Sequence, residues 1–289
     1  MKTEVKKIDA TKRELNIEVS AEAVKNKFND VFNKINQQAK VPGFRPGHIP
    51  RDILEKNFSQ MANEMVLKDL IPDFYSQAIE KEALDAVAAP DISEIKLDGA
   101  NLVFKATLEV VPEIRVKDYK GLKIDYKNVE VSLDDIKRGI DGLKESRKIE
   151  EADDNFAKGL GYPDLAGLEK SVERQLFLQK ETQQRKKIEA GLIESVVSGL
   201  DFKVPQPLIN RQLEELVRQA KFDLALKGLA REKIEEEEKN LREKLAGEAK
   251  EQVKTYLVLA EIARKENIPL DDHMPQRVIE LLLKEAKWE

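Results

Sequence analysis

The stretch RELNIEVSAEAVKNKFNDVFNKINQQ, residues 13–38, changes its hydrophobic period at Ser20. Before Ser20, the residues Leu15, Ile17 and Val19 alternate with polar ones, which is the pattern of a half-buried strand. After Ser20, apolar residues recur on one face of a helix, namely Val24, Phe28, Val31, Phe32 and Ile35. The change predicts a strand followed directly by a helix, with Ser20 as the N-cap.

The flanking sequence extends this pattern into a small domain. Residues 4–8 read as a preceding strand, and Pro50 restarts a helix as its first residue, after which residues 58–84 continue it with a kink at Pro72. Residues 92–97 and 98–114 read as two strands that turn at Asp98-Gly99. We expect residues 1–112 to form an α+β domain.

Beyond this domain the chain is nearly all helical. Residues 113–150 predict an extended linker strand and a helix, and residues 151–289 predict a helical domain. The expected helices cover residues 132–148, 164–199, 205–229, 231–265 and 275–287. The fold class is therefore a multi-domain, mainly helical protein, an α+β N-terminal domain followed by an elongated all-α domain.

Composition separates the first part of the chain from the rest. Residues 1–60 carry a net charge of +4, whereas the remainder carries −9. Charged residues make up 36% of the 289 residues and aromatic residues only 6%, which suits long solvated helices. The chain has no cysteine, no apolar run of 18 residues and no secretory signal, so we expect a cytoplasmic protein without a membrane span.

Motifs for catalysis are missing from the sequence. The two histidines, His48 and His273, lie more than 200 residues apart, and neither has a second ligand at metal-binding spacing. No phosphate-binding loop or nucleophile motif occurs, so we expect no metal and no cofactor. These features favour a protein that works by binding rather than an enzyme.

The segment VPGFRPGHIP, residues 41–50, places an aromatic residue and a cation at the tip of a stiff Pro/Gly loop. In one reading Phe44 folds back onto the core and Arg45 has no role. In the other the loop is a docking tip, because prolines lower the entropy lost on binding and Phe and Arg contribute strongly to interfaces. Nearby cations would attract a polyanion such as ribosomal RNA, and these are Lys25, Lys27, Lys34, Lys40 and Arg51.

The segment GFRPGHIP within this loop resembles the Gly-Phe-Arg-x-Gly-x-x-Pro signature of trigger factor, the bacterial ribosome-associated chaperone. Residues 13–58 are similar throughout to the ribosome-binding domain of that family. Two later stretches, LINRQLEELVRQAKFDLALKGL and AKEQVKTYLVLAEIARKENI, resemble its helical client-binding domain. The resemblance covers nearly the whole chain.

The resemblance implies a function and a docking site. It implies an ATP-independent chaperone that docks at the ribosomal tunnel exit, on a ribosomal protein and nearby RNA, and shields nascent or unfolded polypeptides. Phe44, Arg45 and Pro46 would form the tip, and Gly43 and Gly47 would permit the turn. Family members often have Lys at the third tip position, so Pro46 removes a charge there.

Two parts of the family pattern are missing. The prolyl-isomerase domain usual in the family is absent between the linker helix and the segment that starts near residue 151. The middle of the second helical arm is also missing, between Asp272 and Pro275. We therefore do not expect the chain to be an enzyme, and we expect a shallower cradle for clients.

The helical domain supplies candidate client-binding residues, which are Phe222, Leu224, Leu226 and Leu229. Each of them could instead pack between helices. Two other functions stay open: a free cytosolic holdase without ribosome docking, and a divergent peptidyl-prolyl isomerase. A homodimer that buries the loop also remains open, because family members can dimerise.

Overall fold

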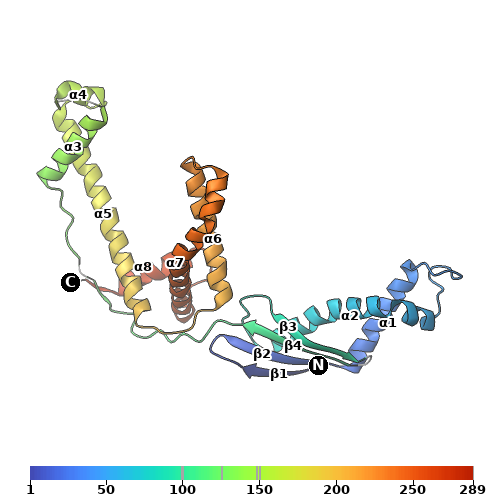
Figure 1. Ribbon diagram of the computed structural model, residues 1–289. Helices are drawn as coiled ribbons and strands as arrows, with labels where there is room; N and C mark the ends of the chain where they lie inside the picture. The colour runs from blue at the N-terminus through green and yellow to red at the C-terminus, as the bar shows by residue number, and fades with distance from the viewer. Residues whose placement is uncertain (99–100, 125, 148, 150, 289) are drawn as a thin grey trace. The chain divides into compact units, whose positions relative to one another are not determined.

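The computed structural model describes residues 1–98, 101–124, 126–147, 149 and 151–288. Its contacts divide the chain into two compact units, whose helices and strands are labelled in Figure 1. Unit 1 comprises Met1–Ile114 and Phe202–Lys254, and unit 2 comprises Arg115–Asp201 and Thr255–Glu289. Each unit is thus assembled from two separate stretches of sequence. The domain boundaries at residues 112 and 150 stay a prediction.

Unit 1 begins with a four-stranded antiparallel sheet in the order β1-β2-β4-β3. The strands are β1 (Lys2–Lys7), β2 (Lys12–Val19), β3 (Asp91–Asp98) and β4 (Asn101–Glu109). Leu15 pairs with Ala106 and Ile17 with Phe104, which places all four side chains on one buried face. The expected strands are confirmed, although Gly99 of the expected turn lies outside the described residues.

Helices α1 (Ala21–Gln38) and α2 (Arg51–Glu82) cover this face of the sheet. The predicted apolar face of α1 is confirmed, because four of its five residues are buried and Phe28 packs against the same core. Ser20 occupies the N-cap, but its side chain makes no capping hydrogen bond. Pro50 is the N-cap of α2 rather than its first helical residue, one position from the prediction.

The predicted kink at Pro72 is wrong in position. Among the described residues of α2, the backbone leaves helical geometry at Phe58, with φ −128° and ψ 16°. Pro72 lies inside the helix on its exposed side, where water can satisfy the carbonyl group that loses its N–H partner. The proline is therefore accommodated without an interruption of the helix.

Unit 1 also contains α6 (Gln206–Leu226) and the first part of α7 (Arg231–Lys265). Side-chain pairs join these two helices: Lys221 lies 2.6 Å from Glu238, and Arg242 binds both carboxylate oxygens of Glu214 at 2.5 and 2.8 Å. The segment before α6 bonds to the sheet domain through Lys203 and Asp9, 2.6 Å apart.

Unit 2 contains β5 (Lys123–Ile124), α3 (Leu133–Arg147), α4 (Asp154–Gly159), α5 (Leu165–Ser198), α8 (Met274–Glu285) and β6 (Lys287–Trp288). Ile140, Phe156, Leu168 and Val172 form a small core where α3, α4 and α5 meet. The long helices match the prediction within a few residues, but α4 was not expected. Among the described residues of the linker strand expected at 113–131, only β5 is regular, and it pairs in parallel with β6.

The structure agrees with the expected fold class, an α+β N-terminal domain followed by helices. Over the residues that can be described, no helix is long and apolar enough to cross a membrane. The same residues contain no cluster of His, Cys, Asp or Glu that could hold a metal ion.

Candidate functional site

The loop between α1 and α2 consists of two consecutive turns. The N–H of Phe44 donates to the carbonyl of Val41 at 3.1 Å, and the N–H of His48 donates to the carbonyl of Arg45 at 3.0 Å. Gly43 and Gly47 have φ values of +89° and +88°, which residues with a side chain rarely adopt. A Cβ at either position would meet nothing within 4 Å, so the backbone alone requires glycine there.

Asn36 of α1 anchors the second half of the loop. Its backbone carbonyl accepts from the N–H of Gly47 at 2.8 Å, and its side-chain oxygen accepts from the N–H of Ile49 at 3.0 Å. Ile49 itself is buried in the core of unit 1. The loop is therefore held at its base, and sequence reasoning missed the residue that holds it.

The tip of the loop is exposed. Phe44 is 40% exposed and is not among the described residues that pack against the core of unit 1, and Arg45 and Pro46 are exposed as well. The reading in which Phe44 folds back onto the core is therefore wrong. The structure thus presents an aromatic ring and a guanidinium group on an anchored turn, while their docking role stays a prediction.

A groove of about 960 Å³ lies between α1 and α2, and Phe28 and Phe32 form its apolar part. The Arg51 guanidinium lies 3.9 Å from the centre of the Phe32 ring and bonds to Glu55 at 2.5 Å. Lys27 pairs with Asp69 of α2 at 2.8 Å. Two of the expected cations are therefore paired with acids of α2, which weakens the basic field predicted around the loop.

The four candidate client-binding residues lie at the end of α6 and just after it. Phe222 and Leu226 are 62% and 72% exposed and stand one helical turn apart. Leu229 is 38% exposed, whereas Leu224 is half-buried. Three of the four are therefore surface residues rather than packing residues, which is the arrangement that client binding requires.

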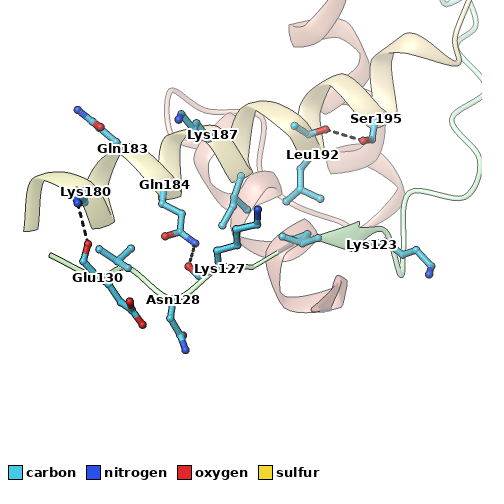
Figure 2. A pocket seen from close by; sticks show the side chains of 14 residues that line it. Lys123, Lys127, Asn128, Glu130, Lys180, Gln183, Gln184, Lys187, Leu192 and Ser195 are labelled. Carbon is cyan, nitrogen blue, oxygen red and sulfur yellow. Dashed lines mark hydrogen bonds between the residues drawn. The ribbon is translucent and has the colours of Figure 1, made fainter. Parts of the chain in front are cut away.

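Unit 2 carries a further surface that sequence reasoning missed. Residues 126–131, which we call the strap, follow β5 and run along α5 (Figure 2). Gln184 donates to the carbonyl of Lys127 at 2.5 Å, and Lys180 donates to the carbonyl of Glu130 at 2.9 Å. A groove of about 590 Å³ lies between the strap and α5. No sequence motif marks this surface, because its two walls are about 50 residues apart along the chain.

Two protein-family models match the chain, and together they span most of it. The model described as "Bacterial trigger factor protein (TF)" matches residues 1–143. The model described as "Bacterial trigger factor protein (TF) C-terminus" matches residues 164–287. The interval between the two matches includes the junction at which the sequence predicts a missing domain.

Individual relatives agree with these models. A trigger factor from Solibacter usitatus is 23% identical over 358 residues, covering 90% of this chain and 85% of the relative. One from Streptomyces avermitilis is 36% identical over 148 residues, covering 50% of this chain and 32% of the relative, so that match spans about a third of its length. The first alignment is longer than the 289 residues of this chain, because the relative contains residues that this chain lacks.

A solved structure has a similar fold. Its title is "Promiscuous Substrate Recognition in Folding and Assembly Activities of the Trigger Factor Chaperone". It superposes with a TM-score of 0.58 at 16% sequence identity, covering 98% of this chain and 93% of that one. At this identity the likeness supports the fold, and the site residues must be judged from their own geometry.

Proposed function

This chain belongs to the bacterial trigger factor family of chaperones, and on that premise we propose that it docks at the ribosomal tunnel exit and shields nascent or unfolded polypeptides without ATP. The family match supports the chaperone activity. Docking and independence from ATP rest on the loop and on the lack of a nucleotide-binding motif in the sequence. Independence from ATP predicts that ATP and Mg²⁺ leave the suppression of client aggregation unchanged.

The observation that carries the docking proposal is the exposed, anchored tip at Gly43–Gly47. Arg45 is exposed and can form a bidentate pair with a carboxylate of a ribosomal protein or contact an RNA phosphate. Phe44 offers an apolar ring beside it. Because the two glycines and Asn36 fix the turn before binding, little entropy is lost when it docks.

Co-sedimentation with empty bacterial 70S ribosomes tests this proposal. The parent chain is expected to pellet with ribosomes, and the Phe44→Ala/Arg45→Ala/Pro46→Ala variant is expected to stay in the supernatant. A matched control, Arg218→Ala/Phe222→Ala, also removes an exposed Arg and Phe but lies on α6. This control should pellet like the parent, and raising the salt concentration should weaken binding of the parent.

Failure of the folded parent to pellet would contradict ribosome docking. The alternative, a free holdase acting through its helices, would then gain support if the chain still suppressed aggregation of an unfolded client. Equal pelleting of the parent and the loop variant would instead show that another surface docks. A homodimer would be seen as a concentration-dependent mass in sedimentation equilibrium.

We also propose that the chain is not a prolyl isomerase. The two family models leave residues 144–163 unmatched, and the isomerase domain that the family resemblance leads one to expect would fall in this interval. A chymotrypsin-coupled peptide assay is the direct test. Acceleration of prolyl isomerisation in proportion to chain concentration would overturn this proposal and revive the divergent isomerase.

A further inference from the structure

The strap presents backbone N–H groups that have no acceptor among the described residues. Among the described residues, none of its N–H groups at 126–131 donates a hydrogen bond to a protein acceptor. Its carbonyls at Lys127 and Glu130 bond to side chains of α5, which hold the strap in place (Figure 2). A fixed stretch of backbone with free N–H groups is the feature to which an added strand binds.

The chain itself adds a strand immediately before the strap. β6 pairs in parallel with β5, matching Lys287 to Lys123 and Trp288 to Ile124. The N–H of Lys287 donates to the carbonyl of Leu122 at 2.8 Å. The strap begins two residues after Ile124, the last paired residue of β5, so it lies close along the chain to a strand edge that is already in use.

An apolar pocket of about 470 Å³ lies next to this edge. The rings of Tyr126 and Trp288 meet edge to face with centres 5.9 Å apart, and both are about half exposed. Val129, Ile188 and Leu283 complete the apolar lining. The rim carries Glu181 and Arg185, one acid and one base, which gives no preference for a charged ligand.

We propose that the strap binds an extended segment of an unfolded polypeptide as an added β-strand, with one apolar side chain of that segment in the Tyr126–Trp288 pocket. The inference rests on the proposed chaperone function, for which it names a client site outside the α6 surface. Backbone hydrogen bonds are independent of sequence, and one pocket selects only for an apolar side chain. The site would therefore accept many clients weakly.

The probe is a fluorescein-labelled peptide of alternating Leu and Thr with an Asp at each end and no Trp. Its binding to the full chain is measured by fluorescence anisotropy. Trp288 is the single tryptophan of the chain and lies in the pocket, so its emission provides a second, local signal. We expect saturable binding together with a blue shift of the Trp288 emission, because the bound side chain excludes water from the indole.

A filling substitution tests the pocket. Thr182 is exposed on α5 and lines the pocket, so Thr182→Phe should fill it and weaken peptide binding at least tenfold. Gln179→Phe adds the same ring to an exposed residue of α5 that lines neither this pocket nor the groove between the strap and α5, and it should bind like the parent. Tyr126→Ala, which removes half of the aromatic pair, should also weaken binding.

A modified peptide tests the strand pairing. Replacement of alternate peptide amides by esters weakens the carbonyl acceptors to which the strap's N–H groups would donate, but it keeps the side chains, and it should weaken binding at least tenfold. Equal binding of the ester-containing and plain peptides would overturn strand addition. Equal binding by the parent and Thr182→Phe would overturn the site.

Suppression of aggregation, measured in parallel on the same samples, separates this inference from the proposed function. If the parent protects a client but does not bind the peptide at the strap, the proposed chaperone function stands and the strap site is contradicted. If the parent binds the peptide, Thr182→Phe does not, and the parent protects no client, the strap site stands and the proposed chaperone function is contradicted.

Discussion

Asn36 provides two acceptors to the loop, and only one of them belongs to its side chain. Asn36→Ala should leave the N–H of Ile49 without its partner at 3.0 Å and cost about 0.5–1.5 kcal/mol. We expect weaker ribosome co-sedimentation than for the parent, since the loop must then be ordered on binding. Asn36→Asp keeps the acceptor and should restore most of the binding. Unchanged binding by the alanine variant would show that the anchor does not matter for docking.

At Gly47 there is space for a side chain, but the backbone conformation of this residue is unfavourable for any residue that has one. Gly47→Ala is expected to lower the stability of the folded loop by about 1–2 kcal/mol, because its φ of +88° is unfavourable for an L-residue. Gly142 in α3 makes a matched control, since it is helical and also has open space at its Cβ. Gly142→Ala should stabilise the protein by about 0.5–1 kcal/mol. Thermal melts of both variants should shift in opposite directions.

At the level of elements, Asp9 links the β1–β2 turn to the segment before α6. The Lys203 ammonium, 2.6 Å away, holds the pKa of the Asp9 carboxyl below its usual range, and the N–H groups of Thr11 and Lys12 lower it further. Because the pKa of Asp9 is lower in the folded than in the unfolded state, the contribution of its ionised carboxylate to the stability of the fold is fully present above the unfolded pKa of about 3.9. It is lost as the pH falls through the folded pKa.

Asp9→Asn is therefore expected to lower the melting temperature at pH 7, by an amount that shrinks as the pH falls below about 4. Asp73→Asn removes an exposed carboxylate of α2 that makes no ion pair among the described residues, and it should change little at any pH. Melts at pH 7, 5 and 3 give the comparison. A pH-independent effect of Asp9→Asn would argue against the ion pair with Lys203.

The exposed end of α6 predicts a variant that separates client binding from stability. Phe222→Ser/Leu226→Ser removes two side chains that are 62% and 72% exposed, so its melting temperature should stay close to that of the parent. Suppression of client aggregation should fall several-fold, as each covered apolar side chain is worth about 1.5–3 kcal/mol. Full suppression by this variant would place client binding elsewhere.

The sequence predicts elements well where the apolar pattern is long. The period change at Ser20 locates β2 and α1, and the expected helix at 231–265 matches α7. Prediction from the sequence fails where a few residues decide the backbone geometry. The backbone break occurs at Phe58, which has no distinctive sequence signal, while Pro72 is tolerated within a helix. α4 has only six residues, too few to show a period.

The candidate site could be predicted only in its local part. The tip at Phe44 and Arg45 lies in one short motif, so the sequence identifies it directly. Its anchor and the acids that pair with Lys27 and Arg51 depend on tertiary contacts. The strap and its pocket are formed by residues 126–131, α5, α8 and Trp288 of β6, which only the folded chain brings together.

At the scale of the whole molecule, both units combine stretches that are distant in sequence. Over the part of the chain that the structure describes, the core of the sheet domain nevertheless uses only residues between Leu15 and Val110. A fragment of residues 1–114 should therefore fold alone and melt cooperatively. A fragment of residues 115–201 should not, since β5 lacks β6 and α5 lacks α8 without residues 255–289. Circular dichroism melts of both fragments test this, and a cooperative transition in the second would contradict it.

The junction between α3 and α4 has a consequence for how such chains diversify. Arg147 and Asp153 line the same small pocket, so the chain leaves and re-enters the core of Ile140, Phe156 and Leu168 at nearly one place. A domain spliced in here enters and exits through neighbouring points, and one in-frame event can add or delete it whole. The core formed by α3, α4 and α5 would keep its packing with or without such an insertion.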